Sequence, residues 1–188
     1  MKPMIAAVGL LVSHSLSLAQ GTVNFSNFPP FGGTRLITYD ASVPGKNSAP
    51  VEVGSLNVAL YWAPLGSTES QLVQIGSIGI IAPIPGIFAS GTRKTGTATP
   101  EGAPALFQVR AWSVGFNSYE AALASGGSSV LAGKSLLFQN DTANFTRPPP
   151  LPPATLNMPG FTVAPIPEPG TFVIGILGAA ALFLFRRK

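Results

Sequence analysis

The carboxylates are the side chains of this chain best suited to chemistry, because its 188 residues include no cysteine and a single histidine, His14. His14 falls in a segment that we expect to be removed, which excludes thiolate and imidazole zinc sites and Cys-His or Ser-His-Asp catalysis. Paired carboxylates can hydrolyse a glycosidic bond once the fold brings them together. The acids of the central part of the chain are Asp40, Glu52, Glu69, Glu101, Glu120 and Asp141. Their spacing selects no pair, so we predict no enzymatic activity, with a secreted glycan hydrolase using two carboxylates as one alternative.

Three short motifs could bind ions, and each has a simpler interpretation. Segment 140–144, Asn-Asp-Thr-Ala-Asn, offers oxygen ligands for calcium but holds one carboxylate, which is more typical of a turn. Segment 126–129, Gly-Gly-Ser-Ser, lacks the lysine and the following helix of a phosphate-binding loop. Arg93 and Lys94 fit an exposed loop or a charged edge strand better than a polyanion site. We therefore predict no catalytic, cofactor-binding or metal site and no cofactor.

Aromatic residues in the central part could form a surface that stacks against sugars. The candidates are Tyr61, Trp62, Trp112, Phe116 and Tyr119. In a domain of this size, aromatic residues on alternating strands are more typical of a core. A carbohydrate-binding or adhesive module therefore stays an alternative.

Alternating hydrophobicity predicts the strands that position these residues. Segments 55–62 and 105–112 alternate apolar and polar residues, as strands with one buried face do. The side chains expected on the inner face are Leu56, Val58, Leu60, Trp62, Phe107, Val109 and Ala111. Gln108 and Arg110 are expected to point outward. Further strands are predicted at 22–28, 34–39, 71–75, 78–81, 87–91 and 135–140.

One short helix is predicted at 118–125. Asn117 or Ser118 can cap its start, Glu120 suits its first turn, and Gly126 can end it. Glycine and proline interrupt the predicted strands at short intervals, as in antiparallel sandwiches. We therefore expect a mainly β fold, a small antiparallel β-sandwich-like domain over residues 20–146.

The first nineteen residues have the pattern of a secretory signal peptide. Lys2 precedes an apolar run over 4–12, and Ser17-Leu18-Ala19 places small residues at the positions that signal peptidase reads. The run is too short to span a bilayer core of about 30 Å. We predict export through the Sec machinery and cleavage between Ala19 and Gln20.

The last residues have the pattern of a membrane segment that follows a short motif. Residues 171–185 carry no charge and end at the basic tail Arg186-Arg187-Lys188, which predicts a single hydrophobic helix with its C-terminus in the cytoplasm. As a helix the fifteen residues would be about 22 Å long, and the basic tail can snorkel to make up the difference. Immediately before it stands Pro167-Glu168-Pro169. Prolines at 165, 167 and 169 predict an extended segment that stays out of any sheet.

In this order, the motif, the helix and the basic tail resemble the PEP-CTERM sorting domain of exported bacterial proteins, over about residues 164–188. The resemblance implies recognition by an exosortase, a membrane protease that cuts near Pro-Glu-Pro, after a transient stay in the inner membrane. It also implies a Gram-negative bacterium that forms a biofilm or makes exopolysaccharide, and delivery to the cell surface or the extracellular matrix. Exopolysaccharide is the partner that the carbohydrate-binding alternative would imply.

The distribution of prolines and charges indicates where the domain ends and the spacer begins. Nine of the nineteen prolines lie between 147 and 169, so we expect 147–163 to be a polyproline spacer and 164–188 the sorting segment. The net charge of +4 lies at the ends: residues 20–167 hold seven basic against six acidic residues. This distribution suits membrane targeting and excludes a nucleic-acid surface. We expect a nonenzymatic structural or interaction protein of the bacterial surface.

Overall fold

The computed structural model describes residues 20–28, 35–146, 148, 150, 152–153 and 156–167. Strands dominate these residues, and α1 is their one α-helix, so the predicted mainly β fold is confirmed. The elements are β1 (Thr22–Ser26), β2 (Ile37–Tyr39), β3 (Leu56–Pro64), the 3-10 helix η1 (Glu69–Gln71), β4 (Val73–Ile80), β5 (Ala89–Lys94), β6 (Pro104–Ser113), α1 (Tyr119–Ser125), β7 (Gly127–Lys134), β8 (Phe138–Asp141) and β9 (Phe161–Ile166).

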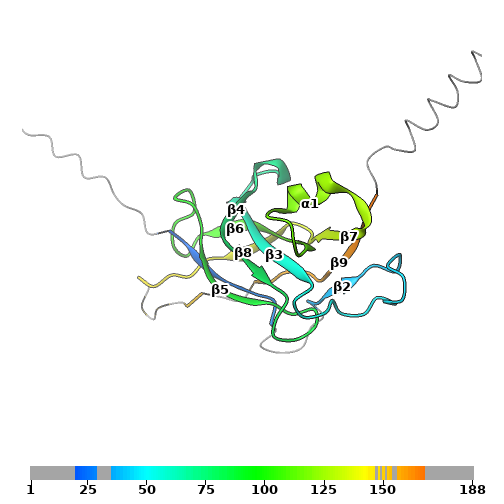
Figure 1. Cartoon of the computed structure of the whole chain (residues 1–188). Helices are drawn as coiled ribbons and strands as arrows, with labels where there is room; N and C mark the ends of the chain where they lie inside the picture. Colours follow the sequence, from blue (N-terminus) through cyan, green and yellow to red (C-terminus); the bar gives the residue numbers. More distant parts are fainter. Residues whose placement is uncertain are drawn as a thin grey trace, which may run out of the picture.

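Most strands belong to one seven-stranded sheet in the order β2-β9-β7-β6-β3-β4 (Figure 1). The long strand β6 pairs with β3 on one side, and with β8 and then β7 on the other. All strand pairs of this sheet are antiparallel except β2 with β9, which run parallel. Strands β1 and β5 form a separate antiparallel ribbon. The predicted antiparallel arrangement therefore holds for every strand pair among the described residues but one.

The inner face of the sheet carries the main core, as the alternation predicted. All seven side chains expected to point inward from β3 and β6 are buried in one hydrophobic cluster. The ribbon contributes Val23 and Phe25 to the same cluster, and the Phe25 and Phe88 rings lie 4.6 Å apart. Burial of this apolar surface is what holds the ribbon against the sheet.

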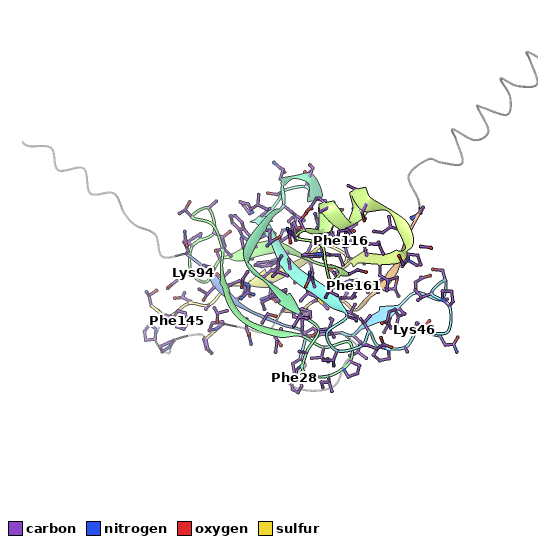
Figure 2. All side chains as sticks on the ribbon, viewed as in Figure 1. Phe28, Lys46, Lys94, Phe116, Phe145 and Phe161 are labelled. Carbon is purple, nitrogen blue, oxygen red and sulfur yellow. The ribbon has the colours of Figure 1, made fainter. Side chains whose placement is uncertain are left out.

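The outer face of the sheet is covered as well. Helix α1 packs Tyr119 and Ala122 onto this face, where Trp112 of β6 is fully buried and Phe116 packs at the margin (Figure 2). Ser118 caps the helix by accepting a hydrogen bond from the Ala121 amide, and Gly126 ends it at φ +62°, as predicted. Four of the five aromatic residues considered for a sugar platform, Tyr61, Trp62, Trp112 and Tyr119, are therefore buried core residues, and Phe116 is partly buried.

Strand β9 corrects the predicted domain boundary. Residues 161–166 were expected to lie in the spacer and the sorting segment, but β9 pairs with β2 along its first half and with β7 along its second. Pro165 is opposite Leu131 beside a register shift in β7, a position where a missing N–H is tolerated. Gly133 makes room for this pairing, because a Cβ there would stand 2.2 Å from the Thr162 carbonyl oxygen. The domain therefore extends to Ile166.

The chain that leads into β9 is also part of the domain. Leu156 and Met158 are buried in the main core. Asn140 in β8 accepts a hydrogen bond from the Asn157 amide at 2.9 Å, and Arg35 donates to the Leu156 carbonyl at 2.8 Å. The proline-rich stretch from 147 to 155 is therefore a connection between β8 and β9, and the spacer predicted over 147–163 does not separate the domain from the sorting motif.

Two other elements differ from the prediction. Strands predicted at 71–75 and 78–81 are one strand, β4, in which Gly76 has φ +69° near a register shift. Residues 127–134, left without a predicted element, form β7.

No helix among the described residues is long and apolar enough to cross a membrane, and the predicted segments 1–19 and 171–185 lie outside those residues.

Candidate functional site

The two predicted processing points adjoin the first and last residues of the domain. Gln20 forms a bridge to Pro100, and Pro167 is exposed immediately after β9. These two ends lie on opposite sides of the domain (Figure 1). Ala19, Glu168, Pro169, Arg186, Arg187 and Lys188 lie outside the described residues.

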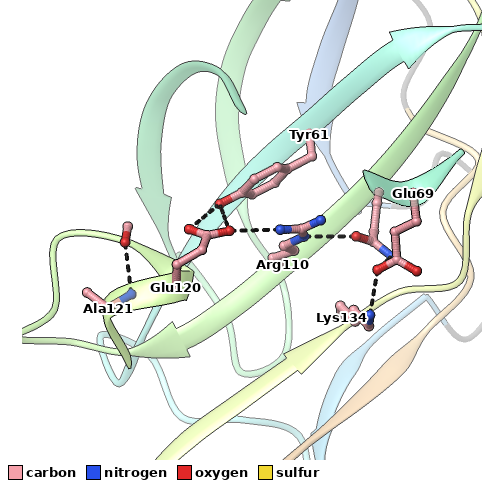
Figure 3. A network of polar contacts seen from close by, with 8 residues as sticks. Tyr61, Glu69, Arg110, Glu120, Ala121 and Lys134 are labelled. Atoms are coloured by element: carbon pink, nitrogen blue, oxygen red, sulfur yellow. Dashed lines mark hydrogen bonds and ion pairs between the residues drawn. The ribbon is translucent and has the colours of Figure 1, made fainter. Parts of the chain in front are cut away.

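Two of the six candidate carboxylates converge on the outer face of the sheet, in a polar network made by Tyr61, Glu69, Gln108, Arg110, Glu120 and Lys134 (Figure 3). Arg110 Nη1 donates to Glu120 Oε1 at 2.8 Å, and Arg110 Nε donates to Gln108 Oε1 at 2.8 Å. Gln108 Nε2 donates in turn to Glu69 Oε1 at 3.2 Å, and Lys134 forms an ion pair with Glu69. Gln108 is thus 1% exposed although it points away from the inner face.

Five separate elements supply this network, β3 among them through Tyr61. Glu69 lies in η1, which a capping box between Thr68 and Gln71 begins. Arg110 of β6 and Lys134 of β7 are paired in register across neighbouring strands. Glu120 stands in the first turn of α1, where the helix dipole favours a carboxylate. The network therefore joins the outer face of the sheet to both short helices.

The Arg110 guanidinium lies on two tyrosine rings. Its Cζ is 3.9 Å from the centre of the Tyr61 ring and 5.3 Å from the centre of the Tyr119 ring. Burial, followed by the nearby Glu120 charge, raises the pKa of the Tyr61 hydroxyl to about 12. Burial likewise raises the pKa of Tyr119. Both hydroxyls therefore stay protonated at neutral pH, which suits packing and hydrogen bonding.

Both carboxylates of the network are held by basic side chains. The hydrogen bond from Lys134, and then that from Gln108, lowers the pKa of the Glu69 carboxyl. A glycosidase needs one carboxylic acid with a raised pKa, which stays protonated until it meets the leaving group. Glu120 is held by Arg110 at 2.8 Å. Each acid of the network thus has a basic partner, and the arrangement fixes η1 and α1 to the sheet.

The other candidate residues are separate from this network. Asp40 accepts a hydrogen bond from the Ser42 amide, which lowers its pKa, and Glu52 pairs with Lys46. In segment 140–144, where a turn was predicted, Asn140 and Asp141 belong to strand β8, so the prediction is wrong for these two residues. Within the described part of the chain, no three His, Asp or Glu side chains gather as a metal site would require.

Arg93, like Gln108, is buried although the sequence predicted it to be exposed. It was expected on an exposed loop or edge, and β5 is such an edge strand, but its side chain is 7% exposed. Alternation of apolar and polar residues could have shown which face of β5 carries Arg93. That alternation is weak in this strand, because Ala89, Gly91 and Thr92 differ little in hydrophobicity.

Comparison of the chain with known protein families, with characterised proteins and with solved structures found no match.

Proposed function

We propose that this chain is an exported bacterial surface or extracellular-matrix protein. A signal peptide over 1–19 directs it through the Sec machinery, and Pro167-Glu168-Pro169, a hydrophobic helix over about 171–185 and Arg186-Arg187-Lys188 sort it through an exosortase. The helix is a transient inner-membrane anchor with its C-terminus in the cytoplasm. The domain between these signals has a structural or interaction role and no enzymatic activity.

The position of the fold within the chain carries this proposal. Gln20 already pairs with Pro100, and β9 ends at Ile166, so the strands lie between the two expected cleavage points. Pro167 is exposed, as the first residue of a protease recognition motif must be. Removing both ends would therefore leave every described element in place.

The arrangement of the β-strands supports the finer fold assignment. The β1-β5 ribbon and the main sheet contribute side chains to one core, as two layers of a β-sandwich-like fold would. The nonenzymatic role is supported by the polar network, where Glu69 and Glu120 are each ion-paired with a basic side chain.

The termini of the mature protein test this proposal. We expect mass spectrometry of the protein released from its native host to find Gln20 as the first residue and a C-terminus close to Pro167. Peptides from 171–188 should be found only in the membrane fraction. A released protein that begins at Met1, or that keeps Lys188, would contradict the proposal.

A further inference from the structure

A groove lies between the edge strand β4 and the ribbon strand β5, away from the polar network. It has a volume of about 380 Å³, and the side chains that matter to its chemistry are those of Asn57, Ser77, Ile78, Ile80, Ser90 and Arg93. We call it the Arg93 groove. Nothing in the sorting proposal uses it.

Arg93 is a buried cation without an acidic partner among the described residues. Its Nη1 donates to the Ser90 carbonyl at 2.6 Å and to the Thr92 carbonyl at 3.2 Å, and its Nη2 donates to the Ser77 carbonyl at 2.8 Å. None of the ion pairs within the described part of the chain includes it, and its Nε has no hydrogen-bond partner there. Its guanidinium also lies 5.0 Å from the centre of the Phe25 ring.

A buried positive charge in these surroundings is incompletely compensated. Carbonyl dipoles and an aromatic face offset part of the desolvation cost of a guanidinium, but a full negative charge offsets much more. Burial lowers the pKa of Arg93, the direction that an uncompensated cation shows. An anion in the groove would supply the missing charge.

Two glycines of β4 keep the groove in this form. A Cβ on Gly76 would stand 2.1 Å from Arg93 Cδ, and a Cβ on Gly79 would stand 2.0 Å from Ser90 Oγ. Only glycine therefore lets the β5 side chains lie this close to β4. The Gly76 backbone, at φ +69°, is also one that other residues rarely adopt.

The remaining lining suits a ligand rich in hydroxyl groups. The Ser77 and Ser90 hydroxyls make no hydrogen bond within the described part of the chain, and the Asn57 side chain uses its amide nitrogen on the Phe116 carbonyl at 3.2 Å. Ile78 and Ile80, both partly exposed, provide apolar surface beside these polar groups. Free hydroxyls, an amide oxygen and an apolar patch are what the polar groups and C–H faces of a sugar contact.

We propose that the Arg93 groove binds a carboxylate-bearing sugar unit, with Arg93 pairing with the carboxylate and Ser77, Ser90 and Asn57 hydrogen-bonding the sugar hydroxyls. The site is independent of export and sorting.

Calorimetric titration tests this site with the full chain in a nonionic detergent at low ionic strength. Trigalacturonic acid is the probe, and the corresponding neutral galactose trimer is the reference sugar. We expect Arg93→Gln to weaken trigalacturonate binding at least tenfold, and Lys94→Gln, an equal charge change on the exposed neighbour, to weaken it less than twofold. Absence of trigalacturonate binding, equal binding of the neutral trimer, or equal losses in the two variants would overturn the proposal.

A second pair of variants guards against misfolding of the Arg93 variant. Ile78 lines the groove and Val73 lies outside it on the same strand, and both are exposed enough to accept a charge. Ile78→Glu should abolish binding by repelling the carboxylate, while Val73→Glu should bind as the unmodified chain does. Retained binding in Ile78→Glu would contradict the site. A short peptide with a free C-terminal carboxylate that binds in place of trigalacturonate would overturn the sugar assignment.

Discussion

Ile166, the last residue of β9, is paired with Gly127 of β7 beyond a register shift, and the residue that follows it is Pro167. The Pro-Glu-Pro sequence therefore begins one residue beyond a paired position of the main sheet. The sequence from Pro167 onward therefore follows the domain directly, without the spacer that the prolines of 147–163 suggested.

Strand β9 makes residues 147–167 essential to the fold. A fragment of residues 20–167 should unfold cooperatively in urea, whereas a fragment of residues 20–146 should not, because it loses the buried Val163, Leu156 and Met158 side chains and leaves β2 and β7 without their partner. Circular dichroism during urea titration measures both. Equal stability of the two fragments would show that the domain ends at residue 146 and does not need β9.

The main core should respond strongly to loss of a ring. Phe107 is fully buried and its ring stacks on Phe138 at 6.1 Å. Phe107→Ala should lower the free energy of unfolding by about 3–5 kcal/mol. Phe145→Ala is the matched control, since Phe145 is 49% exposed and lies at the periphery (Figure 2), and should change stability by less than about 0.5 kcal/mol. Similar urea midpoints for the two variants would contradict the burial of Phe107 in the main core.

Arg110 should contribute to stability through several partners at once. Arg110→Ala removes the contacts with the Tyr61 and Tyr119 rings and the hydrogen bonds to Gln108 and Glu120, so we expect a loss of about 1–3 kcal/mol. Lys94→Ala, an exposed cation on an edge strand, should cost less than about 0.5 kcal/mol. Chemical denaturation compares the two. If Arg110→Ala costs no more than the control, the polar network does not hold α1 and η1 to the sheet.

The Tyr61 hydroxyl should make the protein sensitive to alkaline pH. Its pKa in the folded chain is about 12, above its ordinary value of 10.0, so the folded state disfavours the phenolate. The contribution of the protonated Tyr61 hydroxyl to the free energy of unfolding is fully present below about pH 10 and is lost as the pH rises toward about 12. Thermal unfolding between pH 9 and 12 should show a steeper decline for the native sequence than for Tyr61→Phe. Parallel declines would contradict the raised pKa.

The sequence predicts the inner face of the sheet well and the outer face poorly. A period of two identifies which side chains share a face, so Leu60 and Val109 could be placed in the core. It does not say what covers the opposite face, which is why Gln108 was expected in solvent and is buried under contacts to Glu69 and Arg110. The approach of residues 69, 108 and 120 depends on how β6, η1 and α1 pack, and no local pattern carries that information.

Strand β9 was missed for a different reason. The prolines at 165, 167 and 169 outweighed the alternation of Phe161 and Val163, although Pro165 occupies a position that tolerates a missing N–H. The apolar residues Leu156 and Met158, just upstream, were the signal that the chain returns to the core. Arg93 could not be placed because its burial depends on the glycines of another strand, Gly76 above all.

Replacement of Glu168 is the most direct test of the sorting account. In the native host, Glu168→Ala should leave an unprocessed form in the inner membrane, whereas Asp141→Ala, which removes an exposed carboxylate from the domain itself, should be processed and delivered normally. Immunoblots of membrane and surface fractions measure the size and location of both. Accumulation of full-length Glu168→Ala chain in the inner membrane is the result we predict, and its normal maturation and surface delivery would contradict recognition of Pro167-Glu168-Pro169.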